Sequence, residues 1–405
     1  MCTQREKFYI PPELLRLILL LAGNLHPTNA EDLAWIPEEL RQEEDIYRFD
    51  CTQYLRSDPD LRKCIQYGAV NCLQLYIDLG LHKDYWACAR AATEGQLECL
   101  RLLIDNNFLK DEQACVRAAD EGHVECLRLL IVSDFPKCRY ACTRAAANGK
   151  YDCLQLLIDN NFPKDEDACI WAAKKGHIEC LRLLIANEFP KGEWACAWAA
   201  GEGQLECLQF LIANGFPKSE EACAWAARKR QLECLQFLIA NNFPKSKDAC
   251  AAGASHIACL QLLIDNDFPK SKNACVYAAG EGNYACLKLL IDNGFPKSKD
   301  TYVWAAKKGD LECLRLLIDH DFPKNARACV VAARQGHLEY LRLLITHNFP
   351  KDENACVEAA EGGHFECLRL LIDNGFPKNG DACSRAVRGG HLECHRLLID
   401  NGFPQ

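Results

Sequence analysis

The sequence predicts an all-α protein, an α-solenoid of about 12 to 13 stacked helix-turn-helix repeats. Of the 27 cysteines, most of those from residue 88 onward fall into two series, which begin at Cys88 and Cys99 and advance by 27 residues. The apolar residues in both halves of this repeat have helical spacing. A glycine between the halves and a Phe-Pro pair after them supply the helix ends.

The first half of each repeat follows the pattern Ala-Cys-x-x-Ala-Ala-x-x-Gly, as in residues 114–122. The cysteine and the two alanines lie at i, i+3 and i+4, so they form one stripe of a short helix. Small residues on this stripe let neighbouring helices approach closely. Glycines such as Gly122 and Gly176 supply the left-handed residue that ends the helix.

The second half, for example residues 177–189, has a wide apolar face, while Glu179 and Arg182 lie three residues apart on its polar side. This helix ends before pairs such as Phe295-Pro296. One repeat cannot bury its own apolar faces, so the repeats must stack into an elongated, curved array. Twelve full repeats begin at residues 87, 114, 141, 168, 195, 222, 249, 274, 301, 328, 355 and 382, after a weaker one around Cys72 and Leu73.

The string Ala-Ala-x-x-Gly-His-Leu-Glu at residues 332–339, which recurs in variant form along the array, resembles the core of the ankyrin repeat. The resemblance covers about four fifths of the chain and implies stacked helix pairs that bind a protein partner and catalyse nothing. The period is 27 residues, against about 33 in typical ankyrin repeats. The positions of the projecting β-hairpin are reduced to Phe-Pro-Lys and a few polar residues, so we expect no hairpin.

The sequence divides into an N-terminal segment, residues 1–60, and the repeat array, residues 61–405. Residues 10–19, Ile-Pro-Pro-Glu-Leu-Leu-Arg-Leu-Ile-Leu, resemble the opening helix of an F-box. That resemblance implies that Pro11, Glu13, Leu14 and Ile18 recruit a core subunit of a ubiquitin ligase. The alternative is a hydrophobic helix that caps the array.

The residue just before each alanine pair varies along the array, and we call these residues the ladder positions. On a helical wheel they point away from the Cys/Ala stripe and so away from the core. The candidate partner-binding residues are the basic and aromatic ladder positions Arg90, Arg117, Arg144, Trp171, Trp198, Trp225, Tyr277 and Trp304. Tryptophan and arginine are enriched at interface hot spots, which favours a binding role. The alternative is that successive tryptophans pack on each other and only tighten the stack.

Two further features have open interpretations. The lysines that follow the Phe-Pro pairs could bind phosphates or an acidic partner, or could provide a favourable charge near helix C-termini; examples are Lys137, Lys164, Lys191, Lys218, Lys245, Lys270 and Lys297. The repeat at residues 249–273 is two residues short. Its first helix or turn must be truncated, which makes it either a hinge or a simple deletion.

Composition and spacing argue against several other classes of protein. The net charge is −9, of which residues 1–50 hold about −5, so the array lacks the basic footprint of a nucleic-acid binder. No secretory or membrane-spanning stretch is evident. The cysteines lack metal-site spacing, and the recurring His-x-Glu-Cys, as in His177 to Cys180, falls on scaffold positions. We therefore expect no cofactor, no metal and no catalytic residue.

These observations together predict an adaptor in a reducing compartment, the cytoplasm or the nucleus, whose inner helix face binds a protein partner. The alternative function is that of a substrate receptor of a ubiquitin ligase, recruited through the N-terminal segment.

Overall fold

The computed structural model describes residues 61–78 and 83–404, and within these residues every regular element is a helix. No strand occurs in this part of the chain, which confirms the all-α prediction and the expected absence of a hairpin. The N-terminal segment, with Pro11, Glu13, Leu14 and Ile18, lies outside the described residues. Its role as F-box or cap stays a prediction.

The chain forms two compact units that divide between Gly192 and Glu193. The helices of the first unit are α3 (Leu61–Gln66), α4 (Val70–Asp78), α5 (Ala87–Thr93), α6 (Leu97–Asp105), α7 (Gln113–Glu121), α8 (Val124–Val132), α9 (Tyr140–Ala147), α10 (Tyr151–Asp159), α11 (Asp167–Lys175) and α12 (Ile178–Ala186). Each repeat contributes one helix pair, as the sequence pattern predicts.

The second unit continues the same pattern. Its helices are α13 (Ala195–Gly201), α14 (Leu205–Ala213), α15 (Ala222–Arg228), α16 (Leu232–Ala240), α17 (Ala249–Ala252), the 3-10 turn η4 (Gly253–Ser255), α18 (Ile257–Asp265), α19 (Ala274–Glu281), α20 (Tyr284–Asp292), α21 (Thr301–Lys308), α22 (Leu311–Asp319), α23 (Arg327–Arg334), α24 (Leu338–Thr346), α25 (Asn354–Glu361), α26 (Phe365–Asp373), α27 (Asp381–Arg388) and α28 (Leu392–Asp400).

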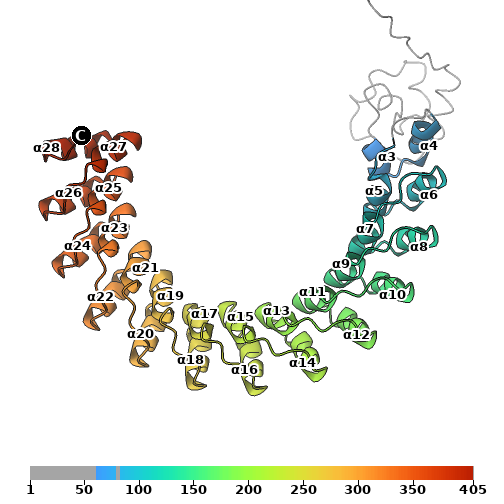
Figure 1. Cartoon of the computed structure of the whole chain (residues 1–405), viewed down its shortest axis with the longest axis horizontal. Coiled ribbons are helices and arrows are strands. Elements are labelled where there is room, and N and C mark those ends of the chain that lie inside the picture. Colours follow the sequence, from blue (N-terminus) through green and yellow to red (C-terminus); the bar gives the residue numbers. More distant parts are fainter. Residues whose placement is uncertain (1–60, 79–82, 405) are drawn as a thin grey trace, which may run out of the picture. The chain divides into compact units, whose positions relative to one another are not determined.

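Within each unit the odd-numbered helices of successive repeats lie side by side in one row and the even-numbered helices in a second row (Figure 1). The first helices pack through the predicted stripe, since Ala168, Cys169 and Ala172 are fully buried, as are their counterparts along the array. Most second helices bury a cysteine and two leucines, for example Cys180 and Leu184. Each repeat therefore packs both between its own two helices and against its neighbours.

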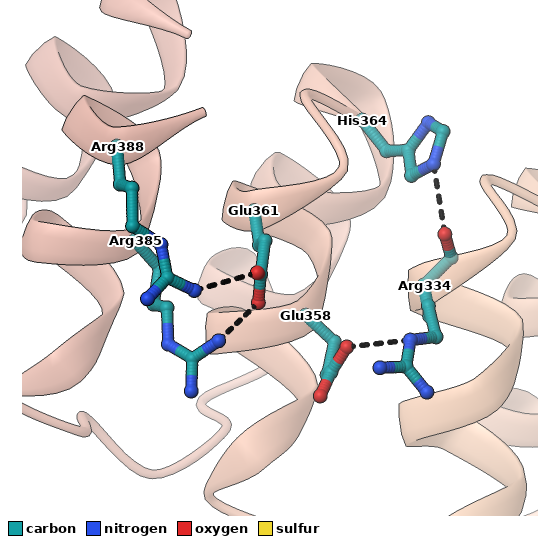
Figure 2. A network of polar contacts seen from close by, with 6 residues as sticks. All are labelled: Arg334, Glu358, Glu361, His364, Arg385 and Arg388. Atoms are coloured by element: carbon teal, nitrogen blue, oxygen red, sulfur yellow. Dashed lines mark hydrogen bonds and ion pairs between the residues drawn. The ribbon is translucent and has the colours of Figure 1, made fainter. Parts of the chain in front are cut away.

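The turn between the two helices of a repeat uses glycine for two reasons. Gly336 has φ of 70°, in the left-handed region that glycine adopts without steric cost. The ring of His364 from the next repeat also covers it, so that a Cβ added at Gly336 would lie 2.5 Å from Nδ1 of His364. That ring donates from Nε2 to the carbonyl oxygen of Arg334 at 2.9 Å (Figure 2). Histidines 123, 177, 337 and 391 cover Gly95, Gly149, Gly309 and Gly363 in the same way.

We expect Gly336→Ala to lower the free energy of unfolding by about 2 to 3 kcal/mol, from the left-handed backbone and from displacement of the His364 ring. Gly390 is a matched control, because its φ is 75° but no atom lies within 4 Å of an added Cβ. Gly390→Ala should cost only about 1 kcal/mol. Urea unfolding of the full chain measures both values.

A double-mutant cycle separates the two contributions, because the cost of Gly336→Ala should fall to about 1 kcal/mol in a His364→Ala background. An unchanged cost in that background would show that the histidine does not contribute to the requirement for glycine.

The lysines after the Phe-Pro pairs cap the second helix of the following repeat. Lys297 Nζ donates to the carbonyl oxygen of His320 at 2.5 Å, directly after α22, and lies 5.8 Å from the ring centroid of Phe322. The same contact recurs in most repeats, for example from Lys164 to the carbonyl of Asn187 at 2.6 Å. These lysines therefore neutralise helix C-termini, as the second of the two sequence interpretations predicts.

The short repeat has the truncated first helix that the sequence predicts. Helix α17 is only four residues long, and the 3-10 turn η4 replaces the remainder of the first helix and the glycine turn. Gly253 is buried here, where an added Cβ would lie 3.1 Å from Cδ1 of Leu263. The chain thus reaches the second helix by a shorter path, without interrupting the row of first helices.

None of the helices in the described part of the chain is long and apolar enough to cross a membrane.

Candidate partner-binding face

The ladder positions lie on the first helices and are exposed or half-buried, as the helical wheel predicts. In the first unit Arg117 and Arg144 are exposed, whereas Arg90 is half-buried and pairs with Asp84 across 3.2 Å. Trp171 is 38% exposed, and the ammonium of Lys174, three residues along α11, lies 4.6 Å from its ring centroid. The first unit therefore presents a largely basic row that ends in one tryptophan.

In the second unit Trp198 and Trp225 contact each other. Their ring centroids are 5.0 Å apart and the ring planes are tilted by 34°. A Cβ added at Gly201 would lie 3.4 Å from Cβ of Trp225, at ordinary contact distance, so glycine leaves this side of Trp225 uncovered. Both tryptophans remain half-buried. Contact between neighbouring tryptophans, the alternative interpretation of the ladder, is thus present here, but it leaves part of each ring accessible.

The same device recurs at Tyr277 and Trp304, which are 53% and 44% exposed. A Cβ added at Gly280 would lie 3.3 Å from Cε3 of Trp304, so this glycine provides the space for the ring. Tyr277, Gly280 and Trp304 line a hollow of about 230 Å³ together with Glu281 and the lysines 307 and 308. The aromatic part of the ladder is therefore uneven, with recesses where glycine replaces a longer side chain.

A larger recess, of about 570 Å³, lies at the short repeat, between Trp225 and Tyr277. Ala252 occupies the ladder position of this repeat, so the aromatic row is interrupted at this point. Ligand sites in proteins commonly enclose about 300 to 1,000 Å³. The recess is thus of a size that can hold a side chain or a short segment of a partner.

Beyond Trp304 the charged ladder positions pair with neighbouring repeats, as Figure 2 shows. Arg334 Nε lies 2.9 Å from a carboxylate oxygen of Glu358, and the two oxygens of Glu361 accept from Arg385 at 2.7 Å and Arg388 at 2.8 Å. These arginines hold the pKa of the Glu361 carboxyl below its usual range. Charges at this end of the array therefore interact with each other.

The cysteines are packing residues. Burial raises the pKa of the Cys169 thiol to about 12 and that of Cys180 to about 11, so that both stay protonated at neutral pH, while only a thiolate is a good nucleophile. The histidine of the recurring His-x-Glu-Cys pattern has a structural role, since His177 covers Gly149. In residues 61–78 and 83–404 no group of three or more His, Cys, Asp or Glu side chains is placed to hold a metal ion.

Sequence reasoning identified the ladder but missed the residues that shape its recesses. These are Gly201 and Gly280, three residues after Trp198 and Tyr277, and Ala252 in the short repeat. The available signal was that glycine stands at 201 and 280 in a register where neighbouring repeats have Lys174, Arg228 and Lys307.

Two sequence profiles of ankyrin repeats match parts of the array. A profile of ankyrin repeats in three copies matches residues 142–222 and 330–404, and a profile of ankyrin repeats in many copies matches residues 115–158. No curated protein gives a significant match. Among solved structures, the crystal structure of the human ASB11 ankyrin repeat domain is similar at 17% identity, over 52% of this chain and 99% of that chain, with a TM-score of 0.34. Residues 115–222 and 330–404 therefore carry ankyrin repeats, and the same helix pairs recur in the repeats between and beyond them.

Proposed function

We propose that the protein is a binding adaptor whose aromatic ladder, Trp198, Trp225, Tyr277 and Trp304, contacts a segment of a protein partner. Ankyrin repeats generally mediate protein–protein interaction. The observation that carries the proposal is that these four rings share one row of helices and stay partly exposed, with recesses between them. Tryptophan and tyrosine rings contribute large contact areas at interfaces.

Within the second unit, a contrast between the charged and the aromatic ladder positions also favours the aromatic ladder as the binding site. Glu358 and Glu361 make ion pairs with neighbouring repeats, so they need no partner protein to neutralise them. The aromatic rings stay partly exposed although they have neighbours within the array, and large exposed apolar patches commonly mark interaction sites. A partner segment laid along the row of first helices would cover several rings at once.

The test is affinity capture from lysate of the source cells with the full chain and with the variant Trp198→Ala/Trp225→Ala. Loss of two central aromatic contacts should weaken capture about ten-fold while circular dichroism stays unchanged. Trp86→Ala is a matched control, since Trp86 is also an exposed tryptophan, 47% accessible, but lies outside the ladder. Equal capture by all three chains would contradict the proposal, and so would loss of capture with Trp86→Ala alone.

A chain that lacks residues 1–60 provides a further arm of this experiment. The F-box-like pattern at Pro11, Glu13, Leu14 and Ile18 predicts that a ubiquitin-ligase core subunit is captured only when these residues are present. In that case the aromatic ladder would select the substrate of the ligase. Partners that depend on the tryptophans but not on residues 1–60 would indicate a simple adaptor. Either result is compatible with reduced thiols in the cytoplasm or nucleus.

A further inference from the structure

The short repeat converts one ladder position into a pocket. Ala252 stands where the flanking repeats have Trp225 and Tyr277, and the two missing residues remove the end of the first helix. Alanines 224, 251 and 252 are part of the pocket lining, and the two aromatic side chains line it from the repeats on either side. The result is a recess of about 570 Å³ lined by small, aromatic and charged side chains.

The polar lining of the pocket is divided between two edges. Glu221 and Asp248 directly precede α15 and α17, so they lie at the edge where these stacked first helices begin. Arg228 and Glu281 are the last residues of α15 and α19, so they lie at the opposite edge, together with Arg230. One edge therefore carries two carboxylates, and the other carries both signs of charge.

The two carboxylates are available to a ligand. In the described residues neither Glu221 nor Asp248 makes an ion pair, whereas Glu358 and Glu361 in later repeats are paired with arginines at 2.7 to 2.9 Å. Arg228 does not neutralise them, because it is at the other end of α15 and its guanidinium lies 5.9 Å from the ring centroid of Trp225. A cation bound at the acidic edge would lie near both carboxylates, in a pocket that two aromatic side chains also line.

We propose that this pocket binds an arginine side chain of the partner segment, between Trp225 and Tyr277, with its guanidinium directed to Glu221 and Asp248. A planar guanidinium stacks on aromatic rings and donates paired hydrogen bonds to carboxylates, which an ammonium does less well. The inference rests on the proposed binding function and specifies what the ladder recognises at its centre.

The probes are four blocked tripeptides, acetyl-Gly-X-Gly-amide with X as arginine, lysine, glutamate or leucine. They are titrated into the full chain labelled with fluorotryptophan, and the fluorine resonance of Trp225, assigned with Trp225→Phe, reports binding. The arginine peptide should bind most tightly, the lysine peptide more weakly, and the other two should cause no saturable shift. A glutamate, lysine or leucine peptide that binds as tightly as the arginine peptide would overturn the proposal.

Two variants test the location. Ala252→Trp restores the aromatic row and fills the pocket, so it should abolish the shift, whereas Val331→Trp places a ring at the same register in a repeat outside the pocket and should leave it unchanged. Glu221→Gln/Asp248→Asn should weaken binding about five-fold without a change in volume. Its control is Asp300→Asn/Asp381→Asn, which removes two carboxylates from beyond the pocket.

Binding that both pocket variants leave unchanged would overturn the proposed site. Because the tripeptides need no partner, their failure would leave partner capture through Trp198 and Trp225 intact. Conversely, failure of partner capture would not alter the tripeptide result.

Discussion

Replacing Tyr340 with cysteine is expected to lower the free energy of unfolding by about 3 kcal/mol, although cysteine occupies this register in the other full repeats. Tyr340 lies on α24 and is 1% exposed. Its hydroxyl donates a long hydrogen bond, 3.4 Å, to the carbonyl oxygen of Tyr302. Tyr302 itself stands where the first helices of the other full repeats have cysteine. The ring therefore fills space that a cysteine cannot fill, and its loss leaves a cavity.

The neighbourhood explains why this repeat tolerates a large residue. Tyr302 is also 1% exposed, and its ring meets that of Phe349 edge to face with centroids 4.7 Å apart. Both exceptions to the cysteine pattern thus stand in adjacent repeats and contact each other. Consensus substitutions commonly stabilise proteins, but here the consensus residue should destabilise because the surroundings have adapted to two tyrosines.

Urea unfolding of three variants checks this expectation. Tyr340→Phe keeps the ring and should cost no more than about 1 kcal/mol. Cys367→Tyr places the same ring at the same register one repeat later, where no space exists, and should cost about 1 to 3 kcal/mol through overpacking. A Tyr340→Cys variant as stable as the parent chain would show that the core closes around the smaller residue.

Much of the fold could be predicted because the same residue pattern occurs in a dozen copies, so that the positions shared by all copies stand out from the variable ones. The stripe of Cys169 and Ala172 is buried as the helical spacing requires, and Gly122 and Gly176 have the predicted positive φ, 89° and 78°. A single copy would have left the helix ends ambiguous. Since each repeat meets only its neighbours, local pattern and tertiary packing coincide in this architecture.

Contacts that depend on the stacking distance could not be predicted. The sequence indicates that Lys297 favours a helix C-terminus, but not that it reaches the carbonyl of His320 in the next repeat. In the same way the sequence shows that the repeat at 249–273 lacks two residues, but it does not show how this deletion changes the structure. Whether two missing residues give a bend or a pocket depends on the 3-10 path through Gly253.

The candidate site was predicted as a row of exposed side chains, and within each unit its residues lie on the row of first helices. What sequence could not show is which rings contact each other and which face a recess. The contact between Trp198 and Trp225 and the recess between Trp225 and Tyr277 both depend on the side chains of the intervening positions. The role of these residues in binding a partner stays a prediction until the variants are measured.

Raising the pH from about 8 to about 10 is expected to unfold the array. Burial raises the pKa to about 12 for eleven thiols, those of Cys88, Cys99, Cys115, Cys142, Cys169, Cys196, Cys223, Cys250, Cys275, Cys329 and Cys356. An unfolded chain releases these protons above about pH 8.5, while the folded chain retains them. The unfolded state therefore binds fewer protons, and stability falls as pH rises from about 9 towards 12.

The size of the effect follows from the number of thiols that shift in the same direction. At about pH 10 each of these thiols favours the unfolded state by about 2 kcal/mol, so that eleven together oppose folding by about 20 kcal/mol. That sum exceeds the whole stability of a typical domain, about 5 to 15 kcal/mol. Urea unfolding at about pH 8 and about pH 10, followed by circular dichroism, measures the loss directly.

The variant Cys196→Ala/Cys223→Ala/Cys250→Ala isolates the thiols from the lysines and tyrosines that also titrate near pH 10. It should be less stable than the parent chain at about pH 8, because three packed sulfurs are lost, but should lose about 6 kcal/mol less between the two pH values. The difference between pH values cancels the packing cost. If instead thiolate absorbance rises while the helical signal is intact, the thiols ionise within the folded array, and the argument that burial prevents thiol chemistry fails with it.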